Sequence, residues 1–320
     1  MKKQRNLLII LLICLISIVG IIVALQPKTE VAYGLKFMLN QDGESYSIVG
    51  VDKLTDVNVE IPSTYNNKPI TKVADNVFSG HKNIISITFP EGITHIGKLG
   101  DLKLLNMQLP KSLERISLNA FENCSLEVVI YMGDINDWAS IFFESYQSSP
   151  ISISNKLYIG GKLINEIDNV CIDRAEKINT FAFWGWENLR TIVLKENVSK
   201  ISDYSFYKCK NLKSVVANGV EIVGKYAFEF CQNLESVELG DKIKEINEGA
   251  FSFCEKLSVI SFGRELESIR KNCFLGCKSL KEINYGGDSS LWDQVKKETF
   301  WNAEIQAQYV NCIDGYAEIN

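Results

Sequence analysis

Cysteine and histidine are the side chains of this sequence that could bind a metal, form a disulfide or act in nucleophilic catalysis. The chain contains nine cysteines and two histidines. Neither His81 nor His95 stands in a recognisable nucleophile motif with cysteine or serine. The close pair Cys273 and Cys277 lacks the histidine or second cysteine pair that would complete a zinc site. The sequence therefore predicts no enzyme, no metal site and no cofactor.

Five of the cysteines occupy one fixed place in a repeat. The repeat is anchored by phenylalanines at steps of 23, 22, 23 and 23 residues, namely Phe183, Phe206, Phe228, Phe251 and Phe274. Three residues after such a phenylalanine, counting Phe121 as well, stand Cys124, Cys209, Cys231, Cys254 and Cys277. A fixed period of this length is typical of a solenoid, in which each coil contacts only its neighbours.

Stacked coils would gather these cysteines in one column, and two interpretations of the column are open. Free cysteine packs in a core as a small hydrophobic side chain. Adjacent coils stack at about strand spacing, ~4.7–4.9 Å, so a disulfide between rungs is also sterically allowed. His81 falls at the cysteine position of an upstream repeat and should lie in the core or at its edge. His95 is expected in a turn.

The other apolar positions predict the local structure of each coil. Counted from the phenylalanine they recur at +3, +6, +9, +11, +15 and +18, as in Cys231, Leu234, Val237, Leu239, Ile243 and Ile246. Steps of three fit a helical or 3₁₀ turn with one buried face, whereas the pair at +9 and +11 alternates like a strand. Each coil should hold a short helical segment and a short strand, which predicts an α/β solenoid.

A longer duplication overlies the repeat. Residues 131–138 (YMGDINDW) match residues 285–292 (YGGDSSLW), 154 positions later. Each copy predicts a short helical insertion, and a strand and turn follow it. We interpret the chain as two tandem arrays with cap-like insertions: a first array at 33–165 with its insertion at 131–165, and a second array at 166–320 with its insertion at 285–320.

Tryptophan and turn residues refine this division. Trp138 and Trp292 take equivalent places in the two insertions, which favours a shared packing role over ligand binding. Trp186 falls at the cysteine position of its repeat and should be core, whereas Trp184 should be exposed and could mark a contact patch. Hairpin turns are expected at the pairs Gly160-Gly161 and Asp314-Gly315.

The repeat AF-x-x-C-x-x-L-x-x-V-x-L, with I-x-x-I at its end, resembles the BspA-type leucine-rich repeats. The resemblance covers about 57–285, and the segment from Tyr33 to Phe78, with a hairpin at Asp42-Gly43, looks like a usual first unit. It implies a leucine-rich-repeat solenoid on a bacterial surface that binds protein or cell-surface ligands, mostly in adhesion. It carries no shared catalytic residues.

The N-terminus predicts export. Residues 7–25 contain no charge, and these 19 residues are long enough to span a bilayer core. Lys2, Lys3 and Arg5 precede them, which places residues 1–6 in the cytoplasm by the positive-inside rule. We expect a signal anchor in the cell membrane, with 26–32 as a linker and the rest as an extracellular single-pass domain. The alternative is a cleaved signal peptide and a secreted protein.

Charge and strand alternation bear on the partner. The net charge is −5, which argues against a nucleic-acid partner because such binding depends on Lys and Arg at phosphates. Positions +8 and +10 of the repeat should point outward from the strands. They predict a protein-contact face made of Thr191, Val193, Ser214, Val216, Ser236, Glu238, Ser261 and Asn284. The alternative is a structural spacer whose strand face is merely solvated.

Overall fold

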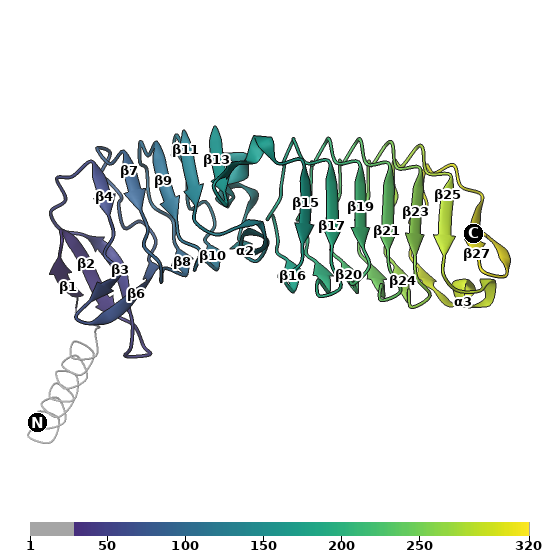
Figure 1. Ribbon diagram of the computed structural model, residues 1–320, viewed down its shortest axis with the longest axis horizontal. Helices are drawn as coiled ribbons and strands as arrows, with labels where there is room; N and C mark the ends of the chain where they lie inside the picture. Colours follow the sequence, from purple (N-terminus) through teal and green to yellow (C-terminus); the bar gives the residue numbers. More distant parts are fainter. Residues whose placement is uncertain (1–28, 320) are drawn as a thin grey trace, which may run out of the picture.

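The structure, a computed structural model, describes residues 29–319. These residues form one elongated body in which coil follows coil from the N-terminal strands to the C-terminus (Figure 1). The predicted anchor at 7–25 and its basic flank at 1–6 lie outside the described residues. Within 29–319, no helix has the length and apolar character needed to cross a membrane.

The second half of the body carries two sheets, one of long and one of short strands. The long-strand sheet contains, in spatial order, β15 (Asn169–Ile172), β17 (Thr191–Leu194), β19 (Ser214–Ala217), β21 (Ser236–Leu239), β23 (Val259–Phe262), β25 (Glu282–Tyr285), β27 (Tyr309–Cys312) and β28 (Gly315–Glu318). The short-strand sheet contains β16 (Lys177–Ile178), β18 (Lys200–Ile201), β20 (Ile222–Val223), β22 (Glu245–Ile246), β24 (Ser268–Ile269) and β26 (Lys296–Lys297).

The first half is built from two further sheets. One contains β1 (Thr29–Ala32), β2 (Leu35–Leu39), β3 (Tyr46–Val51), β6 (Lys68–Val73), β8 (His95–Ile96), β10 (Arg115–Ile116) and β12 (Phe142–Phe143), with β5 (Thr64–Tyr65) paired to β6. The other contains β14 (Lys162–Leu163), β13 (Lys156–Ile159), β11 (Val128–Tyr131), β9 (Asn106–Leu109), β7 (Ser86–Thr88) and β4 (Asn58–Glu60).

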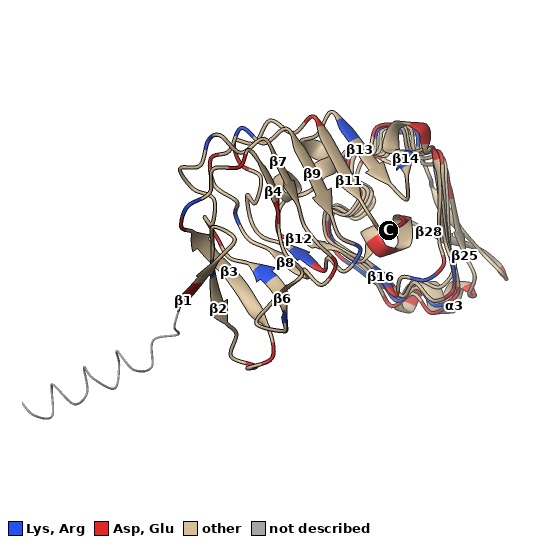
Figure 2. Cartoon of the chain, turned by 60° about the vertical axis from the view of Figure 1, so that its left-hand side comes forward, with Lys and Arg blue, Asp and Glu red and all other residues tan. Residues whose placement is uncertain are grey.

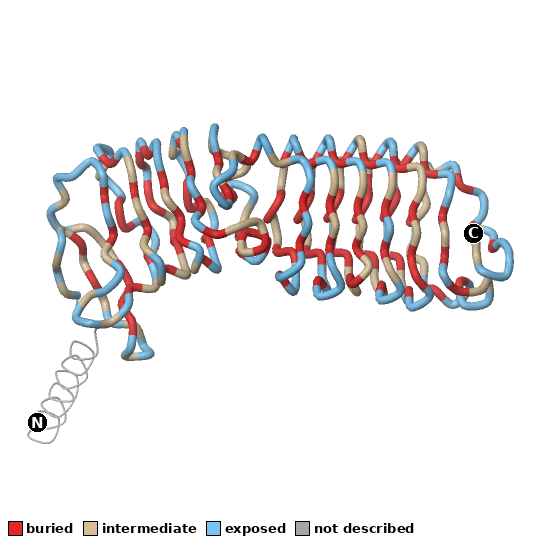
Figure 3. The backbone as a smooth tube through the Cα atoms, viewed as in Figure 1, coloured by how far each residue is buried: buried red, intermediate tan, exposed pale blue. Residues whose placement is uncertain are grey.

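Equivalent repeat positions stand side by side in these sheets. Val215 on β19 is in register with Val237 on β21, and Val237 with Ile260 on β23. Along each long strand of the second array, buried residues alternate with half-buried or exposed ones (Figure 3). The predicted strand at +9 and +11 is therefore confirmed. The predicted hairpins at Asp42-Gly43, Gly160-Gly161 and Asp314-Gly315 also form antiparallel strand pairs.

The helical segment predicted for each coil is wrong. The AF-x-x-C part consists of turns, in which Ala250 N–H donates to Asn247 O and Cys254 N–H to Phe251 O. Two N–H groups between them leave the coil: Phe251 N–H donates to Cys273 O and Phe253 N–H to Leu275 O, both in the next one. Because a helix needs each N–H to bond four residues back within its own chain segment, these bonds to the next coil prevent one. The prediction also missed the second, short strand.

The phenylalanine anchors form a stacked column in the core. The rings of Phe206, Phe228 and Phe251 are fully buried. Their centroids lie 5.1 and 5.2 Å apart, with interplanar angles of 3° and 1°. Phe183 and Phe274 extend the column at its two ends. The stacking confirms that the anchor phenylalanines belong to successive coils of a solenoid.

The cysteine column is reduced in the structure. The cysteines within 29–319 are free, and Cys209, Cys231, Cys254 and Cys277 are fully buried, whereas Cys124 is half-buried. Each buried thiol of the column donates to the carbonyl of a phenylalanine one coil earlier; for example, Cys231 Sγ lies 3.2 Å from Phe206 O. The packing interpretation of the column is therefore confirmed. Burial raises the pKa of Cys231 well above its usual value, which makes the thiol unreactive.

Both predicted insertions contain a short helix. These are α2 (Ile135–Ala139) and α3 (Ser289–Gln294), whose N-caps Asp134 and Asp288 accept backbone N–H groups. Trp138 and Trp292 are buried, so their packing role is confirmed. Three single 3₁₀ turns complete the secondary structure of the described chain: η1 (Tyr146–Ser148), η2 (Pro150–Ser152) and η3 (Ile164–Glu166).

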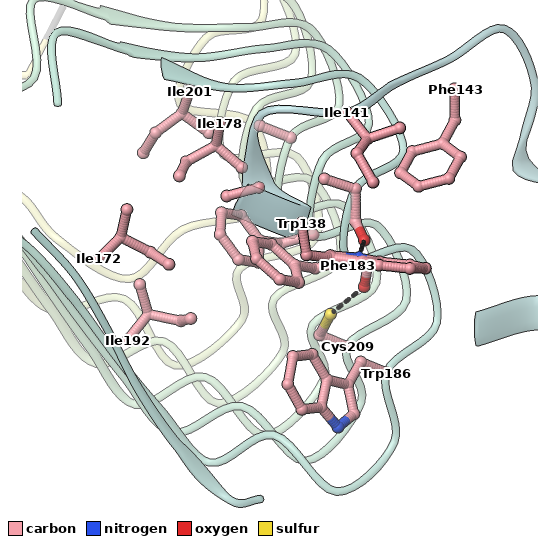
Figure 4. Packing of buried hydrophobic residues seen from close by; sticks show 14 of the residues in the cluster. Trp138, Ile141, Phe143, Ile172, Ile178, Phe183, Trp186, Ile192, Ile201 and Cys209 are labelled. Carbon is pink, nitrogen blue, oxygen red and sulfur yellow. Dashed lines mark hydrogen bonds between the residues drawn. The ribbon is translucent and has the colours of Figure 1, made fainter. Parts of the chain in front are cut away.

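The first insertion joins the two halves of the body. Trp138 on α2 donates from Nε1 to Ala182 O at 2.7 Å and lies beside Phe183 in the core (Figure 4). Asn136 Oδ1 accepts the N–H groups of Asp173 and Arg174. The sheets change between β14 and β15, yet the hydrophobic core continues through this contact from one half to the other. The division into two domains at 165/166 stays a prediction.

Candidate functional site

The eight predicted contact residues lie on the solvent-facing side of one sheet. They occupy β17, β19, β21, β23 and β25, where the residues between them point into the core. Strand pairing arranges them in two rows across the coils, one through Thr191, Ser214 and Ser236 and one through Val193, Val216, Glu238, Ser261 and Asn284. Glu238 is exposed and the other seven are half-buried. We name this surface the strand face.

A shallow hollow of about 910 Å³ lies over the strand face between β19 and β25. Val216, Ser236, Glu238, Ser261 and Asn284 line it. One side is formed by the backbone of the glycines that follow three successive strands, Gly240, Gly263 and Gly286. A Cβ on Gly240 would approach Asn218 O to 2.4 Å, so the chain passes too closely there for any side chain. Because the glycines have no side chains, only backbone borders this edge of the hollow.

Polar side chains at one end of the hollow are bonded to one another. Asn284 donates from Nδ2 to Glu282 Oε1 at 2.9 Å and accepts at Oδ1 from Asn311 Nδ2 at 2.7 Å. Ser261 Oγ is 3.4 Å from the same Asn284 amide nitrogen. These contacts fix the amide orientation, so Asn284 presents a pre-positioned polar group at the C-terminal end of the strand face.

The rim of the hollow carries charges of both signs. Glu196 and Lys242 form an exposed ion pair at 3.5 Å, whereas Glu238 makes no ion pair with any residue of 29–319. Over the second array as a whole, Lys and Arg are interspersed with Asp and Glu along the turns (Figure 2). An open surface with half-buried valine, small polar groups and mixed charge suits contact with a folded protein.

Sequence reasoning missed residues at both ends of the two rows. Asn169 and Cys171 on β15 continue them upstream, and Asn311 on β27 continues the second row downstream. The coil that carries β15 has lost its AF-x-x-C half, so the anchor phenylalanine that numbers the columns is absent there. The alternation of Val170 and Ile172 was the available signal.

The histidines are dispersed and support no catalytic arrangement. His81 is half-buried at the edge of the core, as expected, with Nδ1 3.2 Å from Ser79 O. His95 lies in strand β8 and not in a turn, because it pairs with β6 and β10. Its pKa is lowered, chiefly by burial. Within 29–319, no group of three His, Cys, Asp or Glu side chains could hold a metal ion.

Trp186 and Trp184 lie two residues apart and differ in burial. Trp186 is buried in the core, as predicted. Trp184 is half-buried and not exposed, because Tyr146 and Tyr207 both stack on its ring, at centroid distances of 4.9 and 4.0 Å. Its surroundings could not be inferred from the repeat, since Tyr146 comes from the first insertion.

Three solved structures of bacterial proteins align with most of this chain. A leucine-rich cell surface protein from Faecalibacterium prausnitzii is 17% identical, with 85% of this chain and 98% of that chain covered and a TM-score of 0.46. A leucine-rich repeat protein from Eubacterium ventriosum is 16% identical, with 87% and 94% covered and a TM-score of 0.45. The pneumococcal vaccine antigen PcpA is 17% identical, with 83% and 89% covered and a TM-score of 0.39.

The repeat itself identifies the family. The BspA type leucine rich repeat region matches in six copies, over residues 55–100, 71–170 and 175–306. A comparison with functionally curated proteins gives no match. The repeat matches cover well over half of the chain and agree with the stacked Phe and Cys columns of the structure. The chain therefore belongs to the BspA-type leucine-rich repeat family.

Proposed function

We propose that this protein is a non-catalytic binding module whose strand face contacts a protein partner. The observation that carries the proposal is the hollow of about 910 Å³ across four coils, lined by valine, small polar residues and Glu238 and bordered by a charged rim. Such a surface offers apolar contact at its centre and polar contact at its edge, which is the usual anatomy of a protein interface. Family membership supports binding or adhesion as the general role.

Substitutions on the strand face can distinguish a binding module from a purely structural spacer. We expect Val193→Lys, Val216→Lys and Glu238→Lys together to abolish partner capture while the melting temperature changes little, because these side chains lie on the solvent-facing side of the sheet and outside the core. Capture is measured by placing a photo-crosslinking residue at Ser261 of the full chain in its own host and identifying the adduct by mass spectrometry.

The matched control lies in the first array. Gln108, Ile130 and Tyr158 form the equivalent outward row on β9, β11 and β13, and their replacement by lysine should leave the Ser261 adduct intact. If Ser261 yields no discrete adduct, or if the strand-face substitutions leave its yield unchanged, the spacer alternative is favoured.

We further propose that residues 7–25 anchor the binding module at the outer face of the cell membrane. Support comes from the uncharged 19-residue run and the three basic residues before it. After alkaline washing, the full chain should remain with the membrane pellet at its uncleaved mass. Recovery in the culture medium at a mass lacking about 25 residues would instead identify a cleaved signal peptide.

A further inference from the structure

Half-buried aromatic rings cover the turn side of the second array, away from the strand face. A first row runs from Trp184 to Tyr207 and on to Phe230 and Phe253, with ring centroids 4.0, 5.6 and 5.0 Å apart. A second row lies beside it, with steps of 5.4 and 5.2 Å, and consists of Phe181, Tyr204 and Tyr226. The two rows touch where Tyr204 and Tyr207 lie 5.8 Å apart. The aromatic surface is therefore continuous across several coils.

The backbone under the second row does not favour aromatic residues. Phe181, Tyr204 and Tyr226 each stand two residues before an anchor phenylalanine and have φ values of 59°, 57° and 54°. At the same place, other coils of this chain carry residues that accept a left-handed backbone, namely Asn76, Asn119, Gly249 and Asn272. The middle coils thus keep bulky rings at positions where they are strained, which indicates a use for these rings beyond closing the turn.

A carboxyl group lies among the rings. Glu229 directly follows its anchor Phe228. It therefore holds the repeat position that Trp184 and Tyr207 hold in the two preceding coils. Its backbone N–H donates to Tyr226 O at 3.3 Å, and its carbonyl oxygen accepts the N–H of Lys208, the residue after Tyr207, at 2.9 Å. Burial raises the pKa values of Tyr204 and Tyr207, and the nearby charge of Glu229 adds to the increase. Burial raises the pKa of Glu229 itself to about 7. We name Glu229 with Tyr204, Tyr207, Tyr226 and Phe230 the aromatic box.

No cation of the described chain neutralises the box carboxyl by direct contact. Lys208 acts on Glu229 only through its charge, because it is exposed, its Nζ lies 5.3 Å from the Tyr207 ring centroid, and it forms no ion pair with Glu229. The neighbouring carboxylates are already engaged: Asp203 accepts Lys225 N–H at 2.8 Å and Glu248 pairs with Lys271 at 3.2 Å. Glu229 is thus a half-buried acidic group without an ion-pair partner within 29–319.

We propose that the aromatic box is a second docking site, which receives an arginine or lysine side chain from a basic segment of a protein partner. Aromatic faces attract a cation through their negative quadrupole, and an incoming cation favours the ionised form of Glu229, whose carboxylate then accepts a charge-assisted hydrogen bond. The charge of Glu229 and its acidic neighbours excludes an acidic segment. The site lies on a different side of the coils from the strand face and does not depend on the function proposed there.

A peptide-binding measurement tests the box. The probe is a fluorescein-labelled nonapeptide of alternating arginine and leucine, and the matched peptide has glutamine in place of arginine. Fluorescence anisotropy with the full chain should show binding of the arginine peptide at least about tenfold tighter than of the glutamine peptide, as expected for a cation held by rings and a carboxylate. Equal affinity for both peptides, or for neither, overturns the proposal.

Variants distinguish docking from a purely structural ring column. Glu229→Gln removes the charge and keeps the shape, and Tyr204→Asn installs the residue that the same place carries at Asn76 and Asn272. Each should weaken arginine-peptide binding about tenfold while the melting temperature stays equal or rises. Lys208→Ala should tighten binding because it removes the competing cation.

Two controls set the limits of the result. Phe300→Asn changes an aromatic residue of the same left-handed type that is 71% exposed outside the box, and it should bind the peptide like the unchanged protein. Val216→Lys on the strand face should do the same. If Tyr204→Asn lowers the melting temperature and leaves peptide affinity unchanged, the rings act only in packing. Capture of a neutral oligosaccharide without the peptide would equally refute a cation site.

Discussion

Replacing Trp138 by alanine should lower the stability of the protein by about 3–5 kcal/mol, as for other large buried aromatic residues, and separate the unfolding of its two halves. Trp138 is fully buried, and its ring packs 5.3 Å from Tyr131 and 5.2 Å from Phe143. Its Nε1 donates to Ala182 O across the change of sheets. Alanine would leave a cavity and an unpaired carbonyl at the contact between the halves.

Two optical signals report the separation. The remaining tryptophans, Trp184, Trp186, Trp292 and Trp301, lie in the second half, so their fluorescence follows that half, whereas far-UV circular dichroism follows both. In urea the two signals should coincide for the unchanged protein and diverge for Trp138→Ala. Trp292→Ala at the far insertion should destabilise without divergence. Coincident midpoints in Trp138→Ala would show that coupling does not depend on this indole.

Substituting Phe228 by alanine should have a comparable effect in the middle of the second array. The ring is fully buried between Phe206 and Phe251, with centroid distances of 5.1 and 5.2 Å. Removing it opens a cavity that touches both neighbouring coils, which costs about 3–5 kcal/mol. Because a solenoid is stabilised by contacts between neighbours, hydrogen exchange should accelerate most in the strands of the adjacent coils.

The matched control is Phe253→Asn. Phe253 also stacks on a phenylalanine, at 5.0 Å from Phe230, but it is half-buried and has a φ of 57°. Asparagine accepts that backbone conformation, so we expect a change in unfolding free energy within about 1 kcal/mol. If Phe253→Asn is as harmful as Phe228→Ala, the outer rings and the core column contribute equally to stability.

The core was predictable because it follows the period. The positions of Phe228, Cys231 and Val237 recur from coil to coil with mostly apolar residues, and a position that recurs must meet its own copies when coils stack. The turn at Ala250 was misread because steps of three suit a helix and a series of turns equally well. What decides between them is the bond from Phe251 N–H to Cys273 O, and no single repeat contains both partners.

The candidate sites were predictable to different degrees. Outward strand residues such as Val216 and Glu238 follow from alternation alone, so their common face could be derived. The hollow depends on the close approach of Gly240 to Asn218 O, which only the folded chain shows. The aromatic box was missed because aligning the repeats emphasises what the coils share. Tyr204 differs from its asparagine and glycine counterparts, and it becomes informative only once the backbone angle that it shares with them is known.

The stacked phenylalanine column also bears on how such a protein could change its length in evolution. The step from Phe206 to Phe228 and the step from Phe228 to Phe251 have nearly the same centroid distance, and each coil bonds to the next through the same strand register. The junctions are therefore interchangeable. Duplication or loss of one whole coil by unequal recombination would rejoin matching columns, so the reach of the molecule can vary while its ends and their chemistry are inherited unchanged.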